Sequence, residues 1–335
     1  MKKIALEKYP FYLFEKIGPY IFLSRFAKEL KKNDIKVSSK YNPFYDVALF
    51  LSTNKSVYKK PYLIRIGGIY FDKNNTIKNT SETNKKIFSS IDNSIGTIFV
   101  SEFTKKLTQR LHKNFNKKNI VINNTVPTFM FNPNGPNKRN LLNIKEDEFV
   151  IIVSSAWRRH KRLKEILELF EILKNKIKKL KLIILGEVKN FNKSDDIIYA
   201  GKIEPNNLPD WYRTGNIYIN LAWIDHNPNT LAEAIACGLP SICTNNGGNK
   251  ELIENCNAGI VSNADKEFQF ELVDYYNPPK PNLDVLEKDF FKIYENYSFY
   301  KNRIKFENIS LEKASLRYLN FIKECLNESN RQKKL

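Results

Sequence analysis

Short apolar runs alternate with amphipathic stretches along the whole chain, a pattern typical of parallel α/β units. Residues 148–155 and 180–186 are almost continuously apolar, as expected for strands that are covered on both faces. Between them, Leu163, Ile166 and Phe170 recur at a spacing that places them on one helical face. The pattern therefore predicts strand–helix–strand units rather than a helical bundle or a β-sandwich.

The same pattern predicts elements throughout both halves of the chain. The predicted strands are residues 4–6, 35–38, 46–51, 62–66, 95–101 and 119–123 in the first half, and 148–155, 180–186, 197–201, 216–221 and 240–244 in the second. The predicted helices are residues 20–32, 80–92 and 102–113, then a helix from Leu163 to Leu173, and then stretches near 229–237, 249–255, 284–295 and 309–326. Residues 125–140 are rich in Pro, Asn and Gly, which predicts an interdomain linker.

Each half thus predicts a Rossmann-like, doubly wound sheet, so the predicted fold class is α/β with two such domains. Two domains facing each other would leave an interdomain cleft at the carboxyl ends of their strands, where ligands bind in this architecture.

Composition narrows the class of protein. The 335 residues are 42% hydrophobic and 13% aromatic, which favours two packed domains and excludes a disordered chain. Four cysteines without a C-x-x-C pair and only three histidines argue against a disulfide scaffold or a structural zinc site. No apolar run is long enough for a bilayer-spanning helix, and the first ten residues lack the apolar core of a secretory signal. We expect a cytoplasmic protein, or one that is peripheral on the cytosolic membrane face.

Positive charge is concentrated in the first half of the chain. Residues 1–150 carry 27 basic and 12 acidic side chains, a net +15, whereas the remainder carries 28 and 24, a net +4. One interpretation is a basic domain that meets an anionic membrane surface, a lipid-linked substrate or nucleic acid. The other is compositional, because the chain is rich in Lys, Asn and Ile throughout. Nucleic acid is the weakest of these partners, since no RNP-like or helix-turn-helix signature is present.

The most informative segment is residues 216–253. A predicted strand ends there, a polar loop with Asp225 follows, and a helix opens near Asn229, a residue type that favours helix starts. The free N–H groups and partial positive charge of a helix start suit a phosphate group. Glu233 lies one turn into this helix, Gly238 is placed to end it, and Gly247 with Gly248 predicts a second tight turn.

Asp225, seven intervening residues, Glu233-Ala-Ile-Ala-Cys-Gly238 and then Leu-Pro240 resemble the signature of the family 4 (group 1) retaining glycosyltransferases, which have the GT-B fold. Segments 99–107, 124–133, 154–170 and 197–221 resemble further parts of that family in order and spacing. The resemblance implies an acceptor-binding domain at residues 1–135 and a nucleotide-sugar-binding domain at residues 145–283. It also implies that helices within residues 284–330 pack back on the first domain.

The resemblance implies roles for four residues that would act in catalysis. Glu233 would accept hydrogen bonds from the ribose hydroxyls, a task suited to a carboxylate. Asp225 stands where the family usually has Glu, and would contact the donor sugar and support positive charge at its anomeric carbon. Lys161 and Arg158 would neutralise the donor diphosphate as it leaves. The usual Arg-to-Lys spacing falls on Ala156, so Arg158 or Arg159 would have to replace that arginine.

Other residues would complete the donor site by resemblance. Backbone groups would serve at the start of the predicted helix and beside the nucleotide base, and Gly18 would approach the phosphates from the first domain. The implied donor-binding set is Gly18, Arg159, Lys202, Ile203, Asn229, Thr230, Leu231 and Glu233. No carboxylate cluster for a metal is visible in the sequence, and His160 and His226 are not required as bases, because in the family the leaving phosphate is thought to take the acceptor proton.

The implied reaction transfers a hexose-type sugar from a nucleotide diphosphate sugar to an acceptor hydroxyl with retention, without metal or cofactor. A glycan, a polysaccharide or a lipid-linked saccharide could each supply the hydroxyl. Two alternatives stay open: a GT-B-fold epimerase that acts on the nucleotide sugar itself, and a catalytically silent nucleotide- or sugar-binding protein.

Overall fold

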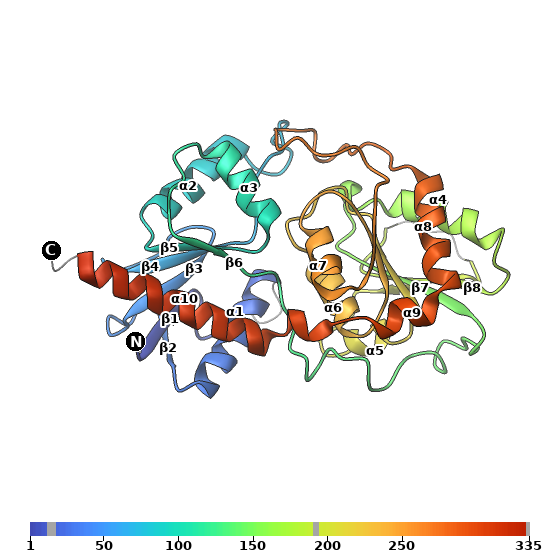
Figure 1. The fold of residues 1–335 in the computed structure, drawn as a ribbon, viewed down its shortest axis with the longest axis horizontal. Helices are drawn as coiled ribbons and strands as arrows, with labels where there is room; N and C mark the ends of the chain where they lie inside the picture. Colours follow the sequence, from blue (N-terminus) through green and yellow to red (C-terminus); the bar gives the residue numbers. More distant parts are fainter. Residues whose placement is uncertain (12–17, 190–193, 333–335) are drawn as a thin grey trace. The chain divides into compact units, whose positions relative to one another are not determined.

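The chain folds into two compact units, each built on one six-stranded parallel sheet with helices packed on it (Figure 1). The computed structural model describes residues 1–11, 18–189 and 194–332. The first unit comprises residues 1–123, 270–273 and 311–335, and the second comprises residues 124–269 and 274–310. The predicted α/β class, with two doubly wound parallel sheets, is confirmed.

The first unit has the strand order β2-β1-β3-β4-β5-β6. Its strands are β1 (Lys3–Leu6), β2 (Lys36–Ser39), β3 (Val47–Leu51), β4 (Tyr62–Ile66), β5 (Gly96–Phe99) and β6 (Asn119–Val121). Its helices are α1 (Gly18–Lys32), α2 (Thr80–Asp92), α3 (Glu102–Leu111) and α10 (Leu311–Gln332). The side chains of β3 and β4 are buried along their full length. Strand β3 is accordingly a continuous apolar run, whereas β4 contains one buried charged residue, Arg65.

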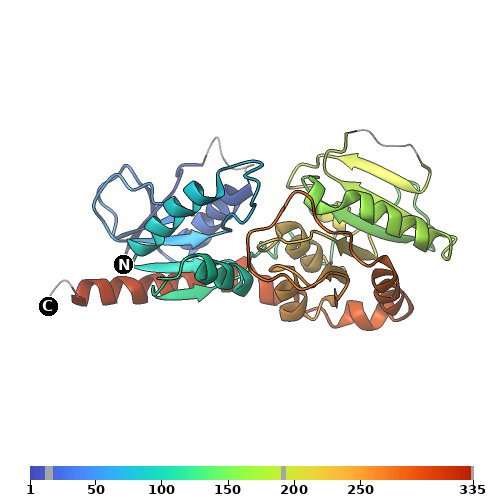
Figure 2. The ribbon, with the colours of Figure 1, turned by 90° about the horizontal axis from the view of Figure 1, so that it is seen from above.

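Helix α10 belongs to the first unit although it is formed near the end of the chain. Its Tyr318, Phe321 and Ile322 join Leu23 and Phe26 of α1 in one hydrophobic cluster. The rings of Phe26 and Tyr318 lie 5.2 Å apart, and Figures 1 and 2 show the red helix α10 running along the blue and teal elements of this unit. Helix α10 is therefore part of the hydrophobic core of the first unit.

The second unit has the strand order β12-β11-β10-β7-β8-β9. Its strands are β7 (Phe149–Ser154), β8 (Leu180–Leu185), β9 (Ile197–Gly201), β10 (Ile217–Asn220), β11 (Ser241–Thr244) and β12 (Gly259–Ser262). Its helices are α4 (Leu163–Lys174), α5 (Leu208–Tyr212), α6 (Asn229–Ala236), α7 (Asn249–Cys256), α8 (Leu283–Glu295) and α9 (Tyr297–Asn302), with short 3₁₀ turns at Arg159–Lys161 and Phe306–Ile309. Strand β12 was not predicted.

Two details of the domain boundaries differ from the prediction. Helix α8 packs in the second unit, because its Leu286 and Phe290 fill the cluster beneath α4, so only α10 returns to the first unit. The expected linker, residues 125–140, also lies in the second unit. Within it, Phe131 is fully buried, and its ring centroid lies 6.5 Å from that of Tyr212. No helix of the described residues is both long and apolar enough to cross a bilayer.

Candidate functional site

The sheet of the second unit reverses its strand order at β7, which lies between β8 and β10. At such a point the loops that follow the two neighbouring strands run in opposite directions and leave a crevice between them. Ligands bind in this crevice, at the carboxyl ends of the strands. The two loops concerned are the one after β7, which carries Lys161, and the one after β10, which carries Asp225. The Nζ atom of Lys161 forms an ion pair with Oδ2 of Asp225, so the predicted cation and acid meet at this point.

Asp225 is held by backbone groups as well as by Lys161. Its Oδ1 accepts from the Asn227 N–H at 3.2 Å, and its carbonyl oxygen accepts from the Gly248 N–H at 2.7 Å. Burial alone would raise the pKa of Asp225, but the Lys161 ammonium and the Asn227 N–H outweigh it, so the pKa lies below its usual value. Asp225 is therefore an ionised carboxylate in a fixed orientation.

Gly247 allows this close approach of the two loops. Its φ is +83°, and a Cβ atom there would lie 2.4 Å from the carbonyl oxygen of Asp225. Gly201 has a similar φ of +68°, but a Cβ atom there would have no neighbour within 4 Å. Alanine at either glycine would strain the backbone, but only alanine at Gly247 would also push against Asp225. Comparing the two substitutions therefore separates these effects.

We expect Gly247→Ala to destabilise the protein by about 1–3 kcal/mol more than Gly201→Ala, since an overpacked site forces the backbone to move. Both variants share the cost of a left-handed alanine, about 1–2 kcal/mol. Urea unfolding of the two variants measures the difference. Equal losses of stability would mean that the Asp225 loop moves aside freely.

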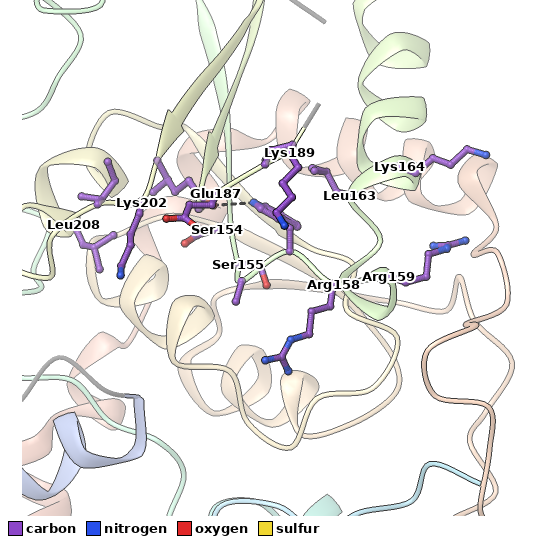
Figure 3. A pocket seen from close by; sticks show the side chains of 16 residues that line it. Ser154, Ser155, Arg158, Arg159, Leu163, Lys164, Glu187, Lys189, Lys202 and Leu208 are labelled. Carbon is purple, nitrogen blue, oxygen red and sulfur yellow. Dashed lines mark hydrogen bonds between the residues drawn. The ribbon is translucent and has the colours of Figure 1, made fainter. Parts of the chain in front are cut away.

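A cavity of about 780 Å³ opens next to these loops. Figure 3 shows the side chains that line it, which come from the loops after β7 and β8 and from the region after β9. Four of the predicted site residues line it, namely Arg158 from the catalytic set and Arg159, Lys202 and Ile203 from the donor-binding set. Ser154, Ser155 and Trp157 line both this cavity and a small hollow, about 20 Å³, that Lys161 and Thr230 also line. The structure therefore gathers six of the predicted residues around one continuous region of the second unit.

The two adjacent arginines of this loop differ in their surroundings. The guanidinium of Arg159 forms an ion pair with the buried Glu165 at 2.8 Å. Arg158 is exposed and makes no ion pair to any residue that the structure describes, and Figure 3 shows its side chain directed away from that of Arg159. Arg158 is therefore the arginine that is available to an anion, whereas Arg159 anchors the start of α4.

Sequence reasoning missed the residue that fixes this loop from behind. Arg162 is fully buried, and its guanidinium forms two hydrogen bonds of 2.8 Å to the carboxylate of Asp265. It also donates to the Pro279 carbonyl at 2.6 Å. The pair joins residues 103 positions apart, so the only local signal was a surplus of basic residues at a helix start.

Helix α6 begins at Asn229, with Pro228 rather than Asn229 in the capping position. Within the part of the chain that the structure describes, no side chain caps its first turn, where Asn229 is exposed, Thr230 half-buried and Leu231 buried. At its other end, Gly238 with a φ of +83° donates to the Ile235 carbonyl, and the next N–H donates to the Ala234 carbonyl. This is a Schellman motif, which confirms the predicted glycine stop.

Glu233 is buried in α6 and accepts a hydrogen bond of 3.1 Å from the hydroxyl of Tyr212. Tyr218 packs edge-on against Tyr212 at 6.0 Å and donates to the Ser154 carbonyl at 3.1 Å. Burial, with the Glu233 charge second, raises the pKa of Tyr212 well above its usual value. Tyr212 therefore stays a hydrogen-bond donor to Glu233, a role that the sequence pattern did not reveal.

The histidine in the basic loop does not suit the role of a general base. His160 is buried and stacks on Tyr275 at 4.3 Å. Burial and then the charge of Lys161 lower its pKa to about 3, so it is neutral and weakly basic near pH 7. Among the described residues, no group of His, Cys, Asp and Glu is arranged to hold a metal ion. The four cysteines are free and buried, as packing residues would be.

Gly18 begins helix α1 of the first unit. Its implied approach to the donor phosphates stays a prediction, as do the roles assigned to the residues of the second unit.

Part of the chain, lying mostly in the second unit, matches a family of known proteins. Residues 135–271 match the family model of "Glycosyl transferases group 1". Protein CapJ of Staphylococcus aureus is 29% identical over 143 residues, which cover 41% of this chain and 33% of that protein. The chain thus spans about a third of the length of this curated relative.

Two solved structures match over nearly the full chain. Sucrose-phosphate synthase of Thermosynechococcus elongatus has a TM-score of 0.71 at 12% identity, covering 98% of this chain and 100% of that one. Anabaena HepE, in complex with UDP and glucose, has a TM-score of 0.62 at 13% identity and covers 100% of both chains. At these identities the likeness establishes the fold.

Proposed function

We propose that this protein transfers a hexose from a nucleotide diphosphate sugar to an acceptor hydroxyl with retention. The proposal starts from the match of residues 135–271 to the model of the group 1 glycosyl transferases and from the GT-B fold of the whole chain. The bond from the anomeric carbon to the diphosphate oxygen breaks, and a bond to the acceptor oxygen forms on the same face. The acceptor proton leaves with the nucleoside diphosphate, so the proposal needs no enzymic base, and His160 is unsuited to be one.

The observation that carries the proposal is the meeting of Lys161, Asp225 and the uncapped start of α6 at the strand-order reversal. A diphosphate placed there would meet the Lys161 ammonium and the backbone N–H groups at the start of α6. It would also meet the Arg158 guanidinium, which is exposed and pairs with no acid among the described residues. Fixed cations and backbone dipoles stabilise negative charge that grows on a leaving group. We propose that they take the place of a metal ion in the reaction.

The remaining roles in the proposal follow the chemistry of each group. Glu233, oriented by the Tyr212 hydroxyl, accepts from the ribose hydroxyls, and the ionised Asp225 faces the sugar. The backbone near Lys202 and Ile203, which line the larger cavity, contacts the base. The UDP and glucose bound by Anabaena HepE favour a uridine diphosphate hexose as the first donor to try. The acceptor is a glycan, a polysaccharide or a lipid-linked saccharide.

Glu233→Gln is expected to abolish most of the stabilisation that a nucleoside diphosphate gives the wild-type protein. A ligand at a hundredfold excess over its Kd adds about 2.7 kcal/mol to the free energy of unfolding, and the amide cannot accept from two adjacent hydroxyls as a carboxylate does. Thermal unfolding with UDP, GDP, ADP and CMP measures this shift. Glu171→Gln, on the exposed side of α4, is the matched control.

A nucleotide that stabilises both variants equally would remove Glu233 from the proposed site. A donor that is converted without any acceptor would favour an epimerase, and a donor that binds but is never consumed would favour a silent binding protein.

A further inference from the structure

Two neighbouring connections of the first unit expose large apolar side chains. One connection, residues 40–46, joins β2 to β3, and the other, residues 52–61, joins β3 to β4. Tyr41 is 67% exposed, Phe44 78% and Val57 51%. The two connections are tied together, because the Tyr58 hydroxyl donates to the Tyr41 carbonyl at 3.0 Å.

Lysines flank these apolar groups. The Lys40 ammonium lies 5.0 Å from the centre of the Tyr41 ring. The Lys60 ammonium lies 5.2 Å from the Tyr45 ring and donates to the Tyr45 carbonyl at 2.8 Å. Lys59 is exposed and forms no ion pair within the described chain. We call the set Lys40, Tyr41, Phe44, Val57, Lys59 and Lys60 the aromatic–lysine surface.

The charge of this region is nearly all of one sign. Residues 40–60 contain four lysines and one acidic residue, Asp46. The Asp46 carboxylate is turned to the start of β1, where it accepts from the backbone N–H groups of Lys2 and Lys3 at 2.6 and 3.0 Å. Negative charge is therefore engaged internally, and the outer side of both connections is positive.

A polar cavity of about 510 Å³ adjoins the exposed apolar groups. Val57, Tyr58, Lys59 and Lys60 line it from one side, and Ser89, Ser90 and Asn93 line it from the end of α2. The Ser90 hydroxyl and the Asn93 amide donate to the backbone carbonyls of Lys86 and Ser89. The positive charge of Lys59 and Lys60 is therefore what suits this cavity to a phosphate-containing head group.

We propose that the aromatic–lysine surface docks the protein on an anionic lipid bilayer, with Phe44 and Val57 entering the interface and the lysines meeting lipid phosphates. Aromatic side chains bind favourably at the boundary between head groups and acyl chains, and nearby lysines are attracted to anionic lipids. A second copy of this chain would present the same positive charge and be repelled. Single-stranded nucleic acid would use aromatic stacking, which gives no role to the aliphatic Val57.

This inference goes beyond the transfer reaction and does not depend on it, since it concerns binding without donor or acceptor. It also distinguishes between the two interpretations of the basic first half of the sequence. If the surface is a docking site, charge there is functional rather than compositional.

The test is co-sedimentation of the full-length protein with vesicles of phosphatidylcholine alone or mixed with phosphatidylglycerol. We expect binding to the mixed vesicles only, and loss of binding at about 1 M salt, where the Debye length falls to about 3 Å. Lys59→Gln should weaken binding about fivefold, because one lysine near an anionic surface contributes about that factor to the affinity. Phe44→Ser should weaken it about tenfold through lost apolar burial.

Matched controls come from the second unit. Phe299 is 60% exposed with Arg303 over its ring at 4.9 Å, and Lys288 is an exposed lysine of α8. Phe299→Ser and Lys288→Gln should leave vesicle binding unchanged, and thermal unfolding of all four variants checks that each is folded.

Equal binding to neutral vesicles, no binding at low salt, or equal losses in the control variants would overturn the proposal. So would displacement from the vesicles by a single-stranded oligonucleotide whose own binding falls in Phe44→Ser, because that result would assign the surface to nucleic acid.

Discussion

Lys161→Met is expected to lower kcat by about 10²- to 10³-fold, the usual loss when one preorganised group that stabilises developing negative charge is removed. Lys161 is mostly shielded from solvent and paired with Asp225, so water cannot substitute for its ammonium in stabilising negative charge. Its loss also leaves the Asp225 carboxylate without its main partner, and the pKa of Asp225 should rise. Release of nucleoside diphosphate from the donor that stabilises the wild-type protein measures the effect.

Lys164→Met is the matched control for this prediction. Lys164 lines the larger cavity, but its side chain is highly exposed and only weakly paired with Glu168 at 4.0 Å, so its removal should change kcat by less than about threefold, the scale of a surface ion pair. Equal effects of the two substitutions would show that general positive charge matters rather than the Lys161 position. Activity that is lost in excess chelator and restored by manganese would contradict the proposed use of Lys161 in place of a metal.

The sequence was most informative where one local pattern determines the outcome. The apolar run at residues 148–155 predicted β7 because a strand covered on both faces has few polar positions. The glycine stop of α6 followed from the left-handed conformation that a helix end requires. The ion pair between Lys161 and Asp225 was predicted only in part: the resemblance named both residues, and the strand order explains why they meet.

Other features depend on contacts between distant segments, which no local pattern encodes. Residues 125–140 have the composition of a linker, yet Arg139 donates to the Thr214 carbonyl and to the Asn216 side chain, so they pack as part of the second unit. Strand β12 is short and begins at Gly259, where a Cβ atom would lie 2.0 Å from the Ser241 carbonyl oxygen. Its identity as a strand comes from pairing with β11 rather than from its own side chains.

Three neighbouring arginines differ in burial although the sequence pattern does not distinguish them. Arg158, Arg159 and Arg162 are three arginines within five positions. One is exposed without an ion pair to a described residue, one is paired with Glu165, and one is buried against Asp265. Only Arg162 is expected to contribute strongly to stability. Deleting one partner of a buried ion pair lowers the free energy of unfolding far more than deleting one partner of an exposed pair.

Arg162→Met is accordingly expected to lower the free energy of unfolding by about 3–5 kcal/mol, because it leaves the Asp265 carboxylate buried without its partner. Both side chains of this pair are almost completely inaccessible to solvent. Met fills a similar volume, and the left-handed backbone at this position, with a φ of +59°, is the same in both variants. Urea unfolding measures the change.

The double variant Arg162→Met/Asp265→Leu separates the lost charge pair from lost packing. Because replacing a whole buried ion pair by apolar groups is often neutral, the second substitution should restore most of the stability that the first removes. Lys179→Met, which removes an exposed pair with Asp147, should cost less than about 1 kcal/mol. A double variant as unstable as Arg162→Met would mean that the Arg162 hydrogen bonds to the Pro279 and Leu221 carbonyls, rather than its charge, hold the loop that carries Lys161.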